Sequence, residues 1–285
     1  MQNTSPRPTI VTTNISEDVV KGFGDEWQRF DQSTLTNAEL SAMFDSYFNI
    51  FPWNSLPPNA LGFDLGCGSG RWAKFVAPRV GFLHLIDPSS EALNVARKNL
   101  AATLNCQFHE ASVEAIPLPD NAADFGYSLG VLHHIPDTAA GLRQCVLKLK
   151  PGAPFLLYLY YAFDNRPFWF RLLWQGSDLA RRVISRLPHA LRSFVSNVLA
   201  VLVYWPLTRI ALGLEALGIN VENFPLAWYR HRTLYVMRND ALDRFGTQLE
   251  QRFTQAQVQH MMAQAGLHNI TFNTDQFWTA VGYKK

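Results

Sequence analysis

The chain has 285 residues, of which 48% are hydrophobic and 17% charged, so it can bury a large core and carry an addition to it. The formal net charge of +2 gives no basic surplus, and we expect no nucleic-acid partner. The three cysteines are far apart, which gives no support for a zinc site or a disulfide framework and favours a reduced, cytoplasmic protein without a metal.

The N-terminal stretch is polar and lacks the basic start and apolar run of a secretory signal, so we expect residues 1–16 to be loosely ordered. Next, Phe23, Trp27 and Phe30 stand at i, i+4 and i+7, which predicts one aromatic face of a helix. This helix either packs on the core or forms a lid over a bound ligand. A second aromatic-rich helix is predicted over 38–51, before a run of prolines.

A short apolar strand at 61–65 contains Asp64 and leads into Gly66, Gly68 and Gly70. Glycine tolerates positive φ and lets a backbone approach a ligand closely, so alternating glycines predict a turn shaped around something bound. A dinucleotide site would have glycine at position 71, where Arg71 stands, and no acid in the strand. A carboxylate here suits a cationic ligand and would repel a pyrophosphate.

The D-x-G-x-G-x-G pattern resembles the first motif of the class I S-adenosylmethionine-dependent methyltransferases, in particular the type 11, UbiE-like group that acts on small molecules. The resemblance implies S-adenosylmethionine as the cofactor, with Asp64 near its amino group. It implies that Gly66, Gly68 and Gly70 lie beneath the methionine and ribose parts. Many relatives also carry an F-G-x-x-W-x-x-F element that closes over the cofactor, which makes Trp27 a cofactor contact.

The second strand, 82–86, ends in Asp87 and Pro88, and Ser89 or Ser90 can cap the following helix. A carboxylate at this point offers two acceptors to two neighbouring ribose hydroxyls, and the resemblance assigns that role to Asp87. An Asp that only forms a turn before Pro88 is the alternative.

The third strand, 106–109, leads to Ser112 and Val113. Relatives often have an Asp where Ser112 stands, and that Asp accepts from the adenine amino group. A hydroxyl can accept one such bond but supplies no charge, so backbone groups around Val113 would carry more of the adenine recognition.

The fourth strand, 125–129, ends in Leu129 and continues into a segment similar to the family's S-x-x-V-L-H-H-I-P-D motif. We expect Leu129 and His134 to contact the cofactor and His133 to act as general base, because a neutral imidazole can accept the nucleophile's proton. The alternative is that both histidines only pack or cap a turn. Tyr160, at the end of the fifth strand, could orient an acceptor.

Alternating strand and helix signals predict an α/β fold with a doubly wound, mostly parallel sheet. The tail adds a helix over 254–265 and an antiparallel pair at 268–273 and 277–283, which makes seven strands. The carboxyl ends of parallel strands meet at one edge, so the four motifs converge on one ligand site.

Between these parts, residues 162–252 form an insert with helices predicted at 168–174, 191–205 and 207–217, separated by Pro167, Pro188 and Pro206. The most apolar run, 198–207, is too short to span a bilayer. Three interpretations remain open: a cap over the acceptor site, a homodimer interface, or an amphipathic patch that rests on membrane lipid.

The predicted organisation is an N-terminal segment and helical lid (1–55), a methyltransferase core (56–161 and 253–285) and the helical insert (162–252). The predicted function is S-adenosylmethionine-dependent methyl transfer to a small-molecule acceptor, through an oxygen, nitrogen or carbon nucleophile and by in-line displacement. A cofactor-binding regulatory or scaffolding protein without catalysis, and aminopropyl transfer on the same fold, are the alternatives.

Overall fold

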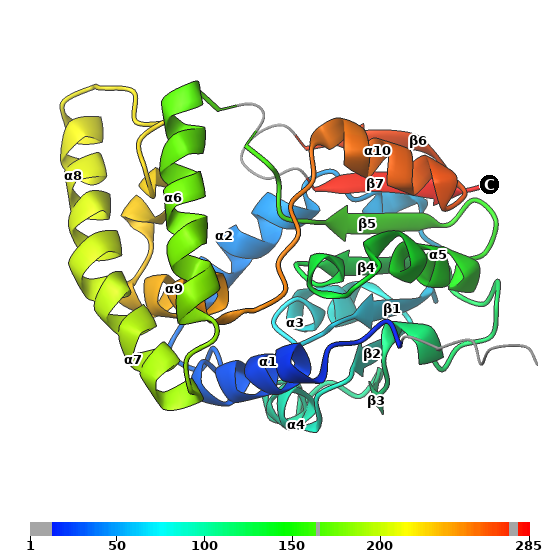
Figure 1. Ribbon diagram of the computed structural model, residues 1–285. Coiled ribbons are helices and arrows are strands. Elements are labelled where there is room, and N and C mark those ends of the chain that lie inside the picture. The colour runs from blue at the N-terminus through cyan, green and yellow to red at the C-terminus, as the bar shows by residue number, and fades with distance from the viewer. Residues whose placement is uncertain (1–12, 164–165, 274–278) are drawn as a thin grey trace, which may run out of the picture.

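The computed structural model describes residues 13–163, 166–273 and 279–285. At its centre is a seven-stranded sheet in the order β3-β2-β1-β4-β5-β7-β6 (Figure 1). The strands are β1 (Leu61–Leu65), β2 (Phe82–Asp87), β3 (Cys106–Glu110), β4 (Phe125–Leu129), β5 (Pro154–Tyr158), β6 (Leu267–Phe272) and β7 (Ala280–Lys284). Strands β1 to β5 pair in parallel, and β7 runs antiparallel to both β5 and β6. The doubly wound, mostly parallel sheet with a closing antiparallel pair is therefore confirmed.

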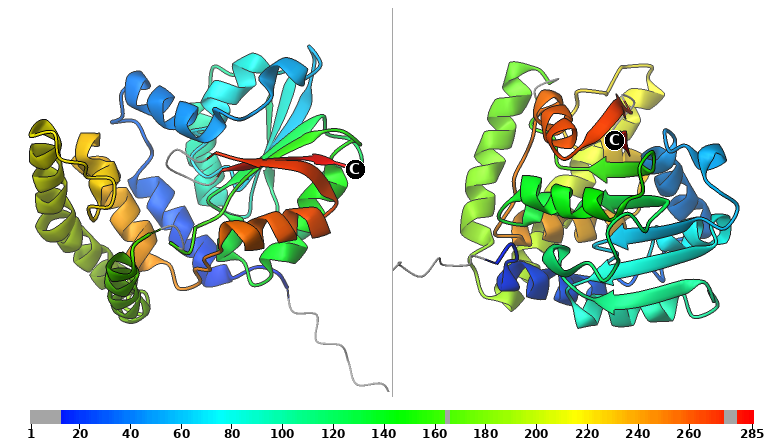
Figure 2. Two further views of the ribbon diagram at one scale, coloured as in Figure 1. Left: turned by 90° about the horizontal axis from the view of Figure 1, so that it is seen from above. Right: turned by 90° about the vertical axis from the view of Figure 1, so that its right-hand side faces the viewer.

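Helices cover both faces of this sheet (Figure 2). They are α1 (Glu17–Arg29), α2 (Asn37–Phe48), α3 (Ala73–Val76), α4 (Ser90–Asn99), α5 (Thr138–Lys148), α6 (Phe168–Ile184), α7 (His189–Leu199), α8 (Trp205–Ala216), α9 (Leu234–Gly246) and α10 (Gln255–Gln264). Apolar side chains of α2, α3 and α4 share one core with β2 and β4, whereas α5 and α10 share a second core with β1 and β5. Strand residues alternate between these cores because successive side chains point to opposite faces of a sheet.

The helix starts follow from local chemistry. Ser89, Asp137 and Thr254 each accept a hydrogen bond at the N-terminus of α4, α5 and α10, as N-cap residues do. Several predicted ends were wrong by one or two residues; β5, for example, ends at Tyr158, before Tyr160. Phe277, the predicted start of the last strand, lies outside the described residues.

The N-terminal segment is better anchored than predicted. Residues 1–12 lie outside the described part of the chain, but Asn14 is buried. Its side-chain amide donates to the carbonyl oxygen of Asp137 (2.8 Å), and its Oδ1 accepts from the N–H of Asp137 (2.7 Å). This two-point contact fixes the approach to α1 against the start of α5.

The insert forms a separate layer beyond the carboxyl ends of the strands, with α9 between the sheet and the outer helices (Figures 1 and 2). Its own small core joins Ala200, Tyr204, Met237, Ala241 and Phe245. This arrangement places the insert next to the edge where the sequence predicted the ligand site.

Pro206 does not separate two helices, contrary to the prediction. A π-helical turn, Ala200–Tyr204, joins α7 directly to α8, and Pro206 falls in the first turn of α8, where its missing N–H costs least. The result is one continuous helix, His189–Ala216.

This helix changes one conclusion from the sequence. By length and composition it is the single helix in the described part of the chain that could cross a membrane, and 28% of its apolar window is buried in the protein. The premise that no apolar segment here is long enough was therefore wrong. Buried helices of soluble proteins pass the same test, so the criterion alone does not make it a membrane span.

Candidate active site

A cavity of about 860 Å³ lies at the carboxyl ends of the strands and extends beneath the insert. One end is walled by the turn after β1, by the end of β2 and by α1. The other end is walled by α6, α8 and α9. The sequence motifs and the insert therefore border one continuous space.

The glycine turn has the predicted backbone. Gly66, Gly68 and Gly70 have φ values of +76°, +52° and +73°, a region that favours glycine. A Cβ on Gly66 would come within 2.3 Å of Val131, and one on Gly68 within 2.8 Å of the Trp27 ring. Gly66 lines the cavity, whereas Gly68 and Gly70 lie outside its lining. Trp27, which also lines the cavity, thus packs directly on the turn as the lid interpretation requires.

Asp87 ends β2 and faces the cavity, with Pro88 beside it. Its Oδ2 accepts from the backbone N–H of Gly68 (2.9 Å), and its Oδ1 accepts from that of Ser89 (2.9 Å). Burial raises the pKa of the Asp87 carboxyl to about 6, and the two N–H donors offset part of this effect. A carboxylate that is held by the turn and still borders the cavity suits recognition of ligand hydroxyls.

Asp64 is placed differently from what the sequence predicted. Its neighbours Phe63 and Leu65 face the core of α5 and α10, so Asp64 points to the opposite face, beside Tyr127. It is buried and lies outside the cavity lining. Burial raises the pKa of its carboxyl to about 8. Direct contact between Asp64 and a ligand in the cavity has no support from this position.

Three further predicted contacts do reach the cavity: Ser112, Val113 and Leu129. Ser112 precedes a short 3₁₀ turn after β3, and Leu129 ends β4. They converge with Gly66 and Asp87 because all of these residues follow the carboxyl ends of neighbouring parallel strands.

The two histidines differ in their access to the cavity. His133 is fully buried outside the cavity lining, with its ring against Tyr160 (3.9 Å between centroids) and His134 (4.0 Å). Burial, with help from His134 and Arg252, lowers the pKa of His133 well below its usual range. A base in that position would be out of reach of the cavity, so the assignment of His133 as general base was wrong.

His134, by contrast, lines the cavity. Its Nδ1 lies 2.7 Å from the carbonyl oxygen of Leu249, and a carbonyl can only accept, so Nδ1 carries a proton. The Nε2 atom then has its lone pair free in the neutral ring, 3.8 Å from Oδ1 of Asp243 and without a hydrogen-bond partner among the described residues. His134 thus offers a proton acceptor beside the cavity.

Tyr160 also lines the cavity, and its hydroxyl donates to Oδ2 of Asp243. Burial and the neighbouring Asp243 carboxylate raise the pKa of Tyr160 well above its usual value. The Tyr160 ring packs on His133 and lies under the guanidinium of Arg252 (5.0 Å). Tyr160 and Asp243 therefore form a fixed polar wall next to Nε2 of His134.

Glu26, Asp240 and Asp243 also line the cavity, and no individual role was assigned to them from the sequence. Burial and the other two acids raise the pKa of Glu26 well above its usual value. Burial, then Asp243, raises the pKa of Asp240 to about 6. The signal was present: Asp240 and Asp243 are three residues apart, which puts them on one face of a helix. This spacing could be connected with the cavity only once the structure placed α9 against it.

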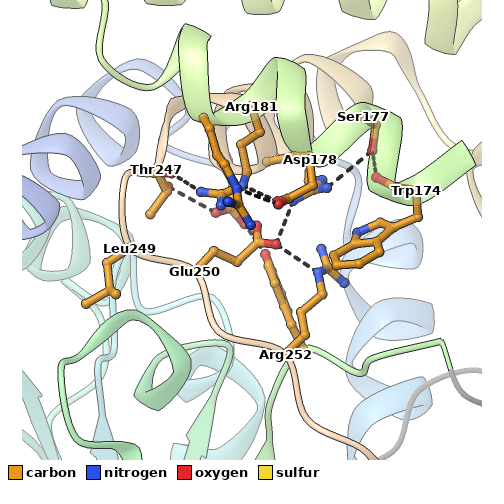
Figure 3. Close-up of polar contacts among 12 residues, drawn as sticks. Trp174, Ser177, Asp178, Arg181, Thr247, Leu249, Glu250 and Arg252 are labelled. Atoms are coloured by element: carbon orange, nitrogen blue, oxygen red, sulfur yellow. Dashed lines mark hydrogen bonds and ion pairs between the residues drawn. The ribbon is translucent and has the colours of Figure 1, made fainter. Parts of the chain in front are cut away.

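A buried ion-pair network holds this end of the cavity to the insert (Figure 3). Glu250 accepts from Arg244 (2.6 Å) and from Nε of Arg252 (2.8 Å). Arg181 of α6 donates to Asp178 (2.8 Å) and to the carbonyl oxygen of Thr247 (3.0 Å). The segment 247–252 also carries Leu249, the partner of His134. The network thus fixes the imidazole through the backbone to which it is bonded.

Among known proteins, the family model of a methyltransferase domain matches residues 63–152, which contain the glycine turn, Asp87 and both histidines. That match lies on the strands and turns whose geometry is described above. Together with the curated relatives, the match supports a class I S-adenosylmethionine-dependent methyltransferase domain in this chain. The predictions of this family and of a methyltransferase enzyme are therefore confirmed at the level of the family.

Two curated relatives of this methyltransferase are named "Ubiquinone biosynthesis O-methyltransferase". One, from Albidiferax ferrireducens, is 32% identical over 130 residues, which are 44% of this chain and half of that protein's length. The other, from Xanthomonas campestris, is 27% identical over 193 residues, 67% of this chain and 80% of that protein. The crystal structure of the S-adenosylmethionine-dependent methyltransferase SibL, at 14% identity, covers 86% of this chain and 55% of that one with a TM-score of 0.50, a likeness of fold alone.

Proposed function

We propose that this methyltransferase transfers a methyl group from S-adenosylmethionine to a hydroxyl oxygen of a small, largely aromatic or apolar acceptor. The carrying observation is the continuous cavity, which runs from Asp87 to a chamber under the insert. That chamber is lined by aromatic side chains, among them Phe163, Phe170, Trp174, Tyr204 and Trp228. Aromatic walls favour an acceptor with a flat or apolar body.

S-adenosylmethionine would supply a methyl group already activated by its sulfonium charge. Gly66, Asp87 and Ser112 would hold its nucleoside, because they border the cavity with an open backbone, a carboxylate and a hydroxyl. Trp27 would cover it from α1. The residues that border the cavity fit the cofactor, with Ser112 in place of the acid common in relatives.

His134 is the proton acceptor in this proposal. A hydroxyl nucleophile must lose a proton, and His134 lines the cavity with a free lone pair on its buried Nε2 when the ring is neutral. Asp243 would stabilise the imidazolium that forms, because its Oδ1 lies 3.8 Å away. The printed names of the two curated relatives, both O-methyltransferases, support an oxygen nucleophile.

A nitrogen acceptor is the second candidate, favoured by the acids Glu26, Asp240 and Asp243 in the cavity wall. Carboxylates that raise one another's pKa are stabilised by a nearby cation, which an amine acceptor would bring. The same acids are the feature that aminopropyl transfer would need, so that reaction belongs to this candidate.

Two measurements test the proposal. Calorimetric titration with S-adenosylmethionine and with S-adenosylhomocysteine should show micromolar binding of both. Labelled methyl transfer to a panel of phenols, aliphatic alcohols and amines should then favour a phenol or alcohol. Turnover of amines alone would move the second candidate ahead. Tight cofactor binding without any transfer would support a regulatory or scaffolding protein.

A further inference from the structure

The outer surface of the insert exposes apolar side chains on an unusual scale. Among the described residues, every exposed large hydrophobic side chain except Leu104 and Leu147 lies between positions 168 and 219. Except for Leu217 and Ile219, which follow the end of α8, these side chains sit on α6 and on the continuous helix α7–α8, the outermost elements in Figure 1. An exposed apolar patch of this extent on a soluble chain marks an interaction surface.

On α6 the exposed stripe is regular. Phe168, Leu172, Leu179 and Val183 follow one another at helical spacing, and Phe168 and Leu179 are 68% and 67% exposed. The opposite side of α6 carries Asp178 and Arg181, which are buried in the ion-pair network. The helix is therefore amphipathic with its polar side turned inward, which is the reverse of a surface helix in water.

The continuous helix α7–α8 shows the same inversion. Leu191, Phe194, Val198, Leu202 and Trp205 stand three or four residues apart and are exposed, Leu202 to 69%. Its inner side buries Ser193, Ser196 and Thr208 together with Ala200 and Tyr204. We call the exposed side chains of these two stripes the apolar face.

Along the two helices that carry this face, the exposed charges between positions 168 and 214 are basic. Between positions 168 and 214 the single acid is Asp178, which is buried and paired with Arg181 and Arg182. Arg171, Arg182 and Arg186 are exposed. Asp25, 3.4 Å from His189, and Glu215, paired with Arg230, lie at the two ends of α7–α8, whereas the arginines along the face complement an anionic lipid surface.

The cavity reaches exposed apolar residues beside this face. Leu173, Val203 and Ile219 both line the cavity and belong to the exposed apolar set. A molecule dissolved in lipid could enter between α6 and α8 without crossing water. This continuity favours a lipid surface over a second copy of the chain, which would cover the entrance.

We propose that the apolar face docks on an anionic membrane and that the cavity takes its acceptor from the lipid. The part about the acceptor rests on the proposed function, whereas the docking does not. The mode is peripheral: the inner side of α7–α8 is packed on α9 through Ala200 and Tyr204, so spanning would expose Met237 and Phe245. Helices of this kind lie in the interface with the apolar face in the acyl boundary.

Vesicle flotation tests the docking. The full chain is mixed with vesicles of phosphatidylcholine alone or of phosphatidylcholine with phosphatidylglycerol. We expect flotation with the anionic vesicles, weakened but not abolished by high salt. The double variant Leu179→Glu, Leu202→Glu should reduce the bound fraction at least about tenfold, because both side chains leave the apolar phase. Leu104→Glu, an exposed leucine outside the face, is the matched control and should float like the original chain.

Four results would overturn the docking. The first is that the chain stays at the bottom of the gradient with anionic vesicles. The second is that Leu104→Glu loses flotation as fully as the double variant. The third is that light scattering shows a dimer that the double variant dissociates, which would make the face a contact between copies. Extraction by detergent only, and not by alkaline carbonate, would replace docking by a membrane span. Calorimetric binding of S-adenosylhomocysteine, measured on the same preparations, tells failure of docking apart from failure of the proposed function.

Discussion

At the scale of single residues, Asp87 carries the most direct prediction. Its carboxylate must be ionised to accept from two ribose hydroxyls, and burial raises its pKa to about 6. The affinity for S-adenosylhomocysteine should therefore increase as the pH rises through about 6. Asp87→Ala should lower the affinity by about tenfold to a hundredfold, the range for hydrogen bonds to a charged group. Calorimetry across this pH range measures both effects.

Asp87→Asn is the matched control, because the amide keeps the shape of the side chain but has no charge to titrate. Its affinity should be lower and should lose the part of the pH dependence that belongs to Asp87. The acid Asp240, with a pKa raised to about 6, also lines the cavity, and Asp240→Asn shows its share. Unchanged affinity in Asp87→Ala would remove Asp87 from the site.

His134 and His133 give a paired prediction because they are adjacent in sequence but differ in access. His134→Gln should lower kcat by about a hundredfold or more, the usual loss with a general base, and leave cofactor affinity nearly unchanged. His133→Gln should act mainly on stability, because His133 is buried outside the cavity lining. Steady-state kinetics and thermal unfolding of both variants separate these roles. Equal loss of kcat in both variants, with equal stability, would contradict the assignment.

At the scale of elements, the segment between α9 and α10 is what holds the insert to the core. Glu250 is buried between Arg244 and Arg252, and the backbone around it bonds to His133 and Tyr160. Although burial raises the pKa of Glu250, the guanidinium groups of Arg252 and Arg244 outweigh it and keep the pKa below its usual value. Its contribution to stability is thus present above the usual Glu value and is lost as the pH falls through the folded one.

Glu250→Gln should therefore lower the free energy of unfolding by about 3 kcal/mol or more near neutral pH, the cost of breaking a buried ion pair. Asp120→Asn, which removes the exposed partner of Lys148, is the control and should change stability little. Denaturant unfolding measures both. Similar stability of the two variants would show that the network is no stronger than a surface pair.

Sequence patterns located the elements well where the physics is local. Glycine spacing, N-caps and strand periodicity depend on a few neighbouring residues, so the turn at Gly66, the cap at Ser89 and the strand ending in Asp87 were all predicted. The break at Pro206 was wrong because a π-helical turn before it absorbs the strain, and no residue pattern announces such a turn.

Because sequence patterns report local physics, they predicted only one side of the site. The side built from the ends of β1, β2 and β4 follows from motifs in order along the chain. Asp243 and Leu249 reach His134 from more than a hundred positions away, through a fold of the insert that no local pattern specifies. Likewise, strand alternation could have shown that Asp64 faces away from Phe63 and Leu65. Only the structure shows which face of the strand borders the cavity.

At the scale of the whole molecule, several carboxyl groups around the ligand site are buried where their ionisation is unfavourable. Burial raises the pKa of four carboxyl groups around the cavity and the turn: Glu26, Asp64, Asp87 and Asp240. In the unfolded chain these groups ionise near pH 4. In the folded chain each of these carboxyl groups therefore releases its proton less readily than in the unfolded chain. Its ionisation at neutral pH lowers the free energy of unfolding.

The sign of the resulting pH dependence can be worked out. A carboxyl whose folded pKa is raised contributes stability that is full below its unfolded value and is lost as the pH rises through the folded value. Above about 6.5 the midpoint of thermal unfolding should thus fall as the pH rises toward about 8, because of Asp64. At lower pH the loss caused by Asp87 and Asp240 is opposed by His84, His109 and His133, whose lowered pKa values make stability rise with pH up to the usual histidine value. Glu250 acts in the opposite direction only in more acidic solution.

Asp64→Asn separates the two parts of this profile, because it removes one buried acid that does not line the cavity. It should raise the unfolding midpoint by an amount that grows as the pH rises from about 4, the unfolded value, to about 8, and so flatten the upper part of the curve. Calorimetric unfolding of both proteins in a buffer series provides the comparison. A stability that rises between about 6.5 and about 8, or an Asp64→Asn curve parallel to the original, would mean that the Asp64 carboxyl ionises without penalty. In that case a partner other than the cationic cofactor would have to neutralise the Asp64 carboxylate behind the glycine turn.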